Sequence, residues 1–299
     1  DDKEFLYGLG EALYHDGADI EAARAAFDRT VELDPTFAVA YQHIIDIEVE
    51  RGDKGRPVAL AQKLHQMNPT NPVPMNLEME ALGRLGDAEA VARVARQVLA
   101  RDPKDPYSRF RLAVYYRMKG EFDSSAAYAR SGNFPEGIAA FVEAERVWLP
   151  LSQGRYREAD RVSKEILGGI PPTSLVPVEL LPSVFPRVRL LVAAGRYDEA
   201  WALTRQVSAT LRSVDPRGVG LQFLGDISLQ TGHLAEAERQ LREFDGVLAK
   251  YPGVRERRLR DFLAGLIALA KGHAGQALPL LDSGESEGPA WTKDNGKDW

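Results

Sequence analysis

The segment LGRLGDAEAVARVARQVLARDP, residues 82–103, contains one tight turn followed by one amphipathic helix. Gly86 ends the preceding helix, because glycine tolerates the left-handed backbone geometry that closes a helix. Asp102-Pro103 ends the helix that follows, since proline disfavours helical geometry in the residue before it. Between these two ends the apolar residues recur at helical spacing, and they are Val91, Val94, Ala95, Val98 and Leu99.

The same two signals return at a fixed interval on both sides of this segment. Four glycines lie 34 residues apart, and they are Gly52, Gly86, Gly120 and Gly154. Four prolines keep this interval, with one position skipped before the last, and they are Pro35, Pro69, Pro103 and Pro171. A period between about 20 and 50 residues is typical of stacked repeats, each of which is one supersecondary unit. The spacing therefore predicts two helices per repeat.

The residues at the repeated positions resemble the tetratricopeptide repeat. In the first unit the matching residues are Leu9-Gly10, Gly17, Ala23, Phe27 and Pro35. The segments GRYREA, 154–159, and GRYDEA, 195–200, match the start of the second helix of that repeat. The resemblance covers residues 5–282 and implies an all-α, right-handed solenoid of antiparallel helix hairpins, with about seven to eight repeats.

Departures from the period suggest divisions along the chain. The segment PPTSLVPVELLPSVFP, 171–186, is rich in proline, and we expect it to be a hinge or an irregular helix start. We therefore predict an N-terminal array over 1–170, a break at 171–186, further repeats over 187–283 and a tail over 284–299. The tail carries Trp291 and Trp299, which could cover a neighbouring array and so support self-association.

The composition fits a folded protein and limits its chemistry. Of the 299 residues, 44% are hydrophobic and 27% are charged, and none is cysteine, which excludes disulfides and thiolate sites. No apolar run reaches the about 18 residues that a membrane span needs. The chain begins at Asp1 rather than Met, so a fragment of a longer protein is one interpretation. The compartment stays undetermined, with the cytoplasm favoured.

The charge is uneven along the chain. The net charge is −6, whereas residues 1–103 alone carry 19 acidic and 11 basic side chains. This excess argues against nucleic acid as a partner and favours a partner with a basic segment. Solvated helix faces would give the same composition, and this alternative stays open.

The sequence contains no HExxH motif of zinc enzymes and no Walker-type phosphate loop. No two of the histidines stand four residues apart, and they are His15, His43, His65, His233 and His273. We therefore expect no catalytic residue, no metal site, no cofactor and no enzymatic activity. The one place where an enzyme site could form is the Pro-rich break.

The resemblance implies that the first helix of each repeat lines a concave wall. Transferring the groove positions of the family to this chain gives Tyr7, Glu11, Tyr14, Gln42, His43, Asp46, Glu50, Asn76, Glu80, Phe110, Arg111 and Arg117. This wall begins acidic and aromatic and becomes basic, which would suit an extended peptide with basic residues at one end.

Two functions follow from this interpretation. The first is a non-enzymatic scaffold that binds a protein or peptide in the concave groove. The alternative is a regulatory or sensor region of a larger bacterial signalling protein, such as a kinase or a transcription regulator. The fold alone does not identify the partner.

Overall fold

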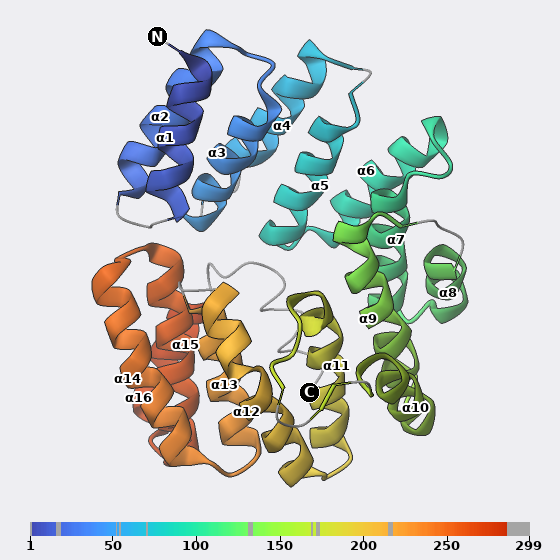
Figure 1. Ribbon diagram of the computed structural model, residues 1–299, viewed down its shortest axis with the longest axis vertical. Helices are drawn as coiled ribbons and strands as arrows, with labels where there is room; N and C mark the ends of the chain where they lie inside the picture. The colour runs from blue at the N-terminus through green and yellow to red at the C-terminus, as the bar shows by residue number, and fades with distance from the viewer. Residues whose placement is uncertain are drawn as a thin grey trace. The chain divides into compact units, whose positions relative to one another are not determined.

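The computed structural model describes residues 2–15, 19–51, 53, 55–69, 71–130, 134–168, 170–171, 174–214 and 218–285. Within these ranges the regular structure consists of sixteen α-helices and one 3₁₀ turn, with no strand (Figure 1). Gly17, Gly52 and the tail with Trp291 and Trp299 lie outside the described residues.

The helices fall into two compact units, which we describe separately. The first unit contains α1 (Lys3–His15), α2 (Ile20–Leu33), α3 (Ala38–Glu50), α4 (Arg56–Met67), α5 (Val73–Leu85) and α6 (Ala88–Arg101), and residues Val247–Arg258 are grouped with it.

The second unit spans Asp102–Gly246 and Leu259–Asp282. Its elements are α7 (Pro106–Met118), α8 (Phe122–Arg130), α9 (Glu136–Ser152), α10 (Tyr156–Leu167), η1 (Val178–Leu180), α11 (Leu181–Ala193), α12 (Tyr197–Val214), α13 (Val219–Gln230) and most of α14 (Leu234–Lys250), α15 (Val254–Ala270) and α16 (Ala274–Glu285).

The periodic glycines join the two helices of a hairpin. Gly86, Gly120 and Gly154 have φ angles of 88°, 76° and 72°, in the left-handed region that favours glycine. Gly195, Gly232 and Gly272 adopt the same geometry between the later helix pairs. The all-α array of antiparallel hairpins expected from the sequence is therefore confirmed.

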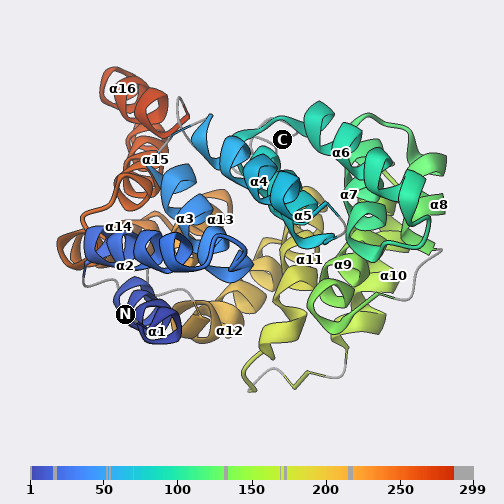
Figure 2. The same ribbon diagram turned by 90° about the horizontal axis from the view of Figure 1, so that it is seen from above.

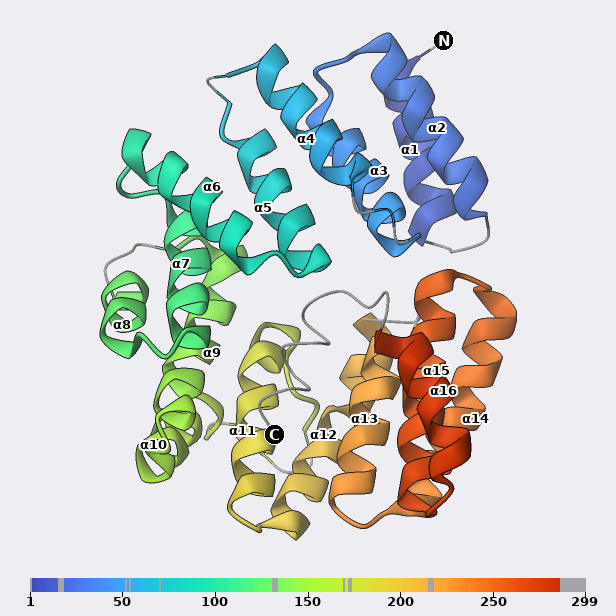
Figure 3. The ribbon, with the colours of Figure 1, turned by 180° about the vertical axis from the view of Figure 1, so that it is seen from behind.

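Successive helices pack on their neighbours in the sequence, as a repeat fold requires. In the first unit α1 lies beside α2, and each following helix packs on the one before it (Figure 2). In the second unit α11 packs on α12 and α12 on α13 (Figure 3). One hydrophobic cluster joins α9, α10 and α11, and the next joins α11, α12 and α13.

Gly10 explains why the repeat needs a small residue at this position. A Cβ atom at Gly10 would lie 2.5 Å from Cε1 of Phe27, which is closer than real Cβ contacts come. Phe27 is fully buried and packs with Ala23, Ala40 and Ile44. The absence of a side chain at residue 10 therefore lets α1 approach the Phe27 ring of α2 closely.

The proline-rich segment forms an irregular start to α11. Pro177 precedes the 3₁₀ turn η1, and α11 follows directly, with Pro182 in its first turn and Pro186 inside it. The preceding backbone is held by α12, because Thr210 Oγ1 donates to the carbonyl of Val176 at 2.9 Å. The amide of Gln206 donates to the carbonyls of residues 171 and 174, at 2.8 and 2.9 Å. The irregular helix start agrees with the expectation, whereas the division of the chain at 171–186 stays a prediction.

Among the described residues, no helix is both long enough and apolar enough to cross a lipid bilayer.

Candidate functional site

Nine of the twelve predicted groove residues belong to the first helices of the first unit. We call this set the first-helix face, and it consists of Tyr7, Glu11 and Tyr14 on α1, Gln42, His43, Asp46 and Glu50 on α3, and Asn76 and Glu80 on α5. Helix α3 packs on α5, and aromatic side chains of α1 contact α3. The period of the sequence therefore brings residues from three repeats onto neighbouring helices.

His43 occupies an aromatic niche at the contact between α1, α2 and α3. Its ring stacks on Phe27 with centroids 4.8 Å apart and an interplanar angle of 12°. Tyr14 and Tyr7 flank it with centroids at 5.1 and 6.0 Å. The His43 side chain is 14% exposed, and burial lowers the pKa of its imidazole, although the charge of Glu11 opposes this shift. The ring is therefore fixed in orientation and favours its neutral form.

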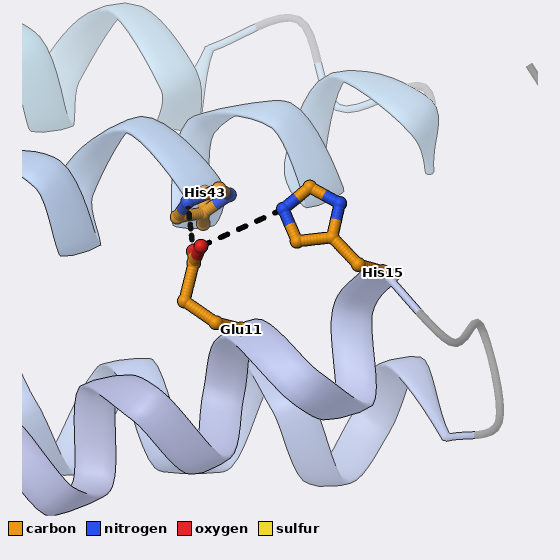
Figure 4. A group of neighbouring side chains, drawn as sticks. All are labelled: Glu11, His15 and His43. Atoms are coloured by element: carbon orange, nitrogen blue, oxygen red, sulfur yellow. Dashed lines mark ion pairs between the residues drawn. The ribbon is translucent and has the colours of Figure 1, made fainter. Parts of the chain in front are cut away.

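Glu11 lies between two imidazoles (Figure 4). One carboxylate oxygen, Oε1, contacts Nε2 of His43, and Oε2 lies 3.6 Å from Nε2 of His15. Tyr7 shares a side-chain hydrogen bond with Glu11, and burial together with this bond raises the pKa of Tyr7 to about 12. Tyr7, Glu11, Tyr14 and His43, which the sequence predicted separately, therefore form one contiguous group.

Arg84 of α5 pairs with Asp46 and Glu50, and Glu80 lies close enough to Asp46 to affect its pKa; we call these four residues the carboxylate cluster. Nη1 of Arg84 contacts Asp46, and Nη2 lies 3.8 Å from Oε1 of Glu50. Burial raises the pKa of Asp46 to about 7, Arg84 opposes this rise, and repulsion from Glu80 and Glu50 adds to it. Asp46 therefore lies near two further carboxylates as well as the Arg84 guanidinium, and a cationic ligand beside it would relieve the repulsion that it feels from them.

The two remaining residues of the first-helix face differ in exposure. Gln42 is exposed on α3. Asn76 is half-buried on α5, and its side-chain oxygen has no hydrogen-bond partner within the part of the chain that the structure describes. Neither residue joins the carboxylate cluster through a contact that we can describe.

The other three predicted residues lie on α7, in the second unit. Arg117 Nε pairs with Oε2 of the buried Glu145 at 2.8 Å, and its guanidinium lies 5.5 Å from the Trp148 ring. Arg111 lies over the Tyr107 ring at 4.7 Å. Phe110 packs near Phe141, with ring centroids 6.1 Å apart. Because Glu145 neutralises Arg117, this surface carries less positive charge than the sequence suggests.

Two residues of these clusters were not among the predicted ones, His15 and Arg84. His15 follows Glu11 by four residues, so it lies one helical turn away on the same face of α1. Arg84 follows Glu50 by 34 residues, so it occupies the equivalent position one repeat later. A comparison of equivalent positions between repeats would have found Arg84.

Comparison with known proteins supports the family resemblance. The family model described as tetratricopeptide repeat matches residues 1–36 and 78–137. These matches include the Leu9-Gly10 and Gly120 motifs, and these two segments therefore carry the tetratricopeptide repeat pattern that the sequence predicted. No curated protein matches the sequence.

Two solved structures resemble the chain at low sequence identity. One is a tetratricopeptide repeat protein from Parabacteroides merdae ATCC 43184, with 14% identity, a TM-score of 0.39, and coverage of 98% of this chain and 96% of that chain. The other is the structure of Naa15/Naa10 bound to HypK-THB, with 12% identity and a TM-score of 0.37, over 87% of this chain and 44% of that chain.

Proposed function

We propose that the chain is a protein-binding scaffold whose first-helix face holds an extended segment with lysine or arginine side chains. The carboxylate cluster is the observation that carries this proposal. Asp46 pairs with Arg84, and the neighbouring carboxylates of Glu50 and Glu80 repel its charged form. A cationic side chain placed beside Asp46 would lower the repulsion among these groups.

The aromatic side chains of α1 complete this surface. Tyr7 and Tyr14 are partly buried, and their rings lie beside His43 on α3, the helix that also carries Asp46. Tyrosines of this kind are enriched in binding surfaces because they offer contact area at low cost in conformational entropy. The proposed partner segment therefore has basic residues for the carboxylate cluster and an apolar residue for the tyrosines.

A pair of labelled peptides tests the proposal. One is an extended peptide with several lysines, and the other is the same peptide with glutamate at each lysine. Fluorescence anisotropy with the full chain should show binding of the lysine peptide, weakened by added salt because the attraction is electrostatic. Equal affinity for the two peptides would contradict the proposal.

A charge reversal with a matched control locates the contact. Glu80→Lys should lower the affinity for the lysine peptide by about tenfold, which corresponds to ~1.4 kcal/mol. Glu89→Lys makes the same charge change at an exposed residue of the second helix α6 and should leave the affinity nearly unchanged. Equal losses in the two variants would indicate attraction by net charge and not a site on the first-helix face.

Other roles considered from the sequence stay open as predictions. The regulatory or sensor role depends on the resemblance alone, and the comparisons add no support for it. Self-association through Trp291 and Trp299 concerns residues outside those that the structure describes. The expectation that the chain is not an enzyme rests on the general character of tetratricopeptide repeat scaffolds.

A further inference from the structure

We propose that Glu11, His15 and His43 form a binding site for a divalent transition-metal ion of the zinc class. The sequence alone predicts no metal site, because no two histidines are four residues apart, the spacing that would place both on one face of a helix. The structure instead brings the ligands together from two helices, since α1 supplies Glu11 and His15 and α3 supplies His43. This inference goes beyond the proposed scaffold function and does not depend on it.

The distances are close to those that a bound ion requires. One ligand atom from each of the three residues lies within 4.8 Å of the other two. Ligands of a tetrahedral zinc ion, bound at about 2.0–2.2 Å, are separated from each other by roughly 3.3 Å. The 3.6 Å distance between His15 Nε2 and Glu11 Oε2 is already near this value. His43 Nε2 contacts the second oxygen of the same carboxylate.

A small side-chain movement would complete the site. The His15 side chain is 64% exposed, and its ring already lies 5.9 Å from the His43 ring, measured between centroids. Figure 4 shows both imidazoles on the same side of the Glu11 carboxylate. The required adjustment therefore falls on the most exposed of the three ligands.

The other two ligands are held in place by neighbouring side chains. Stacking on Phe27 fixes the plane of the His43 ring, and the Tyr7 hydrogen bond restrains the Glu11 carboxylate. Such contacts around metal ligands orient them and tune their basicity. Binding would therefore cost little reorganisation at His43 and Glu11.

Buried polar atoms at this place provide a second observation. Glu11 Oε1 is buried and has no hydrogen bond within the described chain, although it contacts His43 Nε2. A buried carboxylate oxygen is stabilised by a hydrogen-bond donor or by a cation. A cation bound between Glu11 Oε1 and His43 Nε2 would be a partner for both atoms.

The ligand types select the class of ion. Two imidazoles and one carboxylate suit zinc and its neighbours among the first-row divalent ions, whereas Ca²⁺ and Mg²⁺ prefer ligand sets made of oxygen. Three protein ligands leave one position of a tetrahedral ion open. Because His15 and Glu11 are partly exposed, the open position faces solvent. The bound ion would join α1 to α3, and thereby the first hairpin to the second.

Zinc titration of the full chain tests the proposal. We expect isothermal titration calorimetry of the metal-stripped protein to give a stoichiometry of one zinc per chain. His15→Gln removes a ligand that is exposed and should lower the zinc affinity at least tenfold with an unchanged helical circular dichroism spectrum. His273→Gln removes an exposed histidine of the second unit and should leave the affinity unchanged.

Cobalt binding gives a second measurement that does not depend on affinity alone. Co²⁺ in a four- or five-coordinate site absorbs visible light much more strongly than hydrated Co²⁺, so the wild-type chain should show this absorption and His15→Gln should lose it. Glu11→Gln should weaken the same signal. Equal loss of zinc affinity in His15→Gln and His273→Gln, or an absorption spectrum unchanged by His15→Gln, would overturn the proposal. All titrations are run without peptide, so their result is independent of the scaffold test.

Discussion

Replacing Gly10 by alanine should destabilise the first unit, although alanine is the better helix former. Alanine in place of glycine inside a helix gains about 1 kcal/mol. At residue 10, however, the new Cβ would lie 2.5, 2.7 and 2.9 Å from three atoms of the Phe27 ring. Phe27 is fully buried, with a relative exposure of 0%, and the His43 ring stacks on it with centroids 4.8 Å apart. The ring cannot withdraw without moving His43.

The expected magnitude follows from these two opposing effects. Overpacking a well-packed core costs about 1–3 kcal/mol. After the gain in helix propensity is subtracted, the free energy of unfolding should fall by about 1 kcal/mol, at the centre of a range of roughly 0–2 kcal/mol. Gly8 provides the matched control on the same helix, because a Cβ there would meet no atom within 4 Å. Gly8→Ala should therefore stabilise the unit by up to about 1 kcal/mol.

Urea denaturation followed by far-ultraviolet circular dichroism measures both variants. A repeat array can unfold in more than one step. The two variants are therefore compared in the first unfolding transition whose urea midpoint is shifted by Gly8→Ala, because that transition reports on α1. Midpoints that move in opposite directions would support the argument. A Gly10→Ala variant at least as stable as Gly8→Ala would refute the close packing of α1 on Phe27.

Two further predictions concern buried charges. Because the pKa of Asp46 is raised to about 7 in the folded chain, its charged form opposes folding, and this cost grows as pH rises from about 4 to 7. Asp46→Asn should therefore gain stability relative to wild type as pH rises through this range, measured by urea denaturation at pH 4, 6 and 8; a difference that does not change with pH would contradict the raised pKa. Arg117→Met should leave the buried Glu145 unpaired and cost about 3 kcal/mol of unfolding free energy. The double variant Arg117→Met/Glu145→Met should recover much of that loss in the same assay, and no recovery would show that Arg117 acts by packing alone.

The turns between helices were the most predictable part of this fold. Gly86, Gly120 and Gly154 adopt the left-handed geometry expected of them, because that preference belongs to glycine itself and needs no tertiary contact. The end of the short helix α8 follows from the same kind of local preference, since it ends at Arg130, directly before the segment SGNFP, 131–135, whose residues disfavour a helix. Local chemistry therefore determined the element boundaries.

Pairing between side chains was less predictable than the helices that carry them. The repeat period indicates which residues share a helix face, but rotamers and packing decide which of them meet. For this reason Asp46 and Glu50 were recognised as groove positions, whereas their shared partner Arg84 was not. Glu145 likewise neutralises Arg117 from a neighbouring helix, and the period of the sequence contains no information about that contact.

The hydrogen bonds to main-chain carbonyls before α11 determine which sequence changes this segment can accept. Gln206 and Thr210 bind main-chain carbonyl oxygens at residues 171, 174 and 176, and every amino acid has such an oxygen. Leu175 is 66% exposed and can be replaced without loss of these bonds. Adding or removing one residue would instead shift the carbonyls away from their donors. Related chains should therefore vary the identity of the side chains here while conserving the length of the connection.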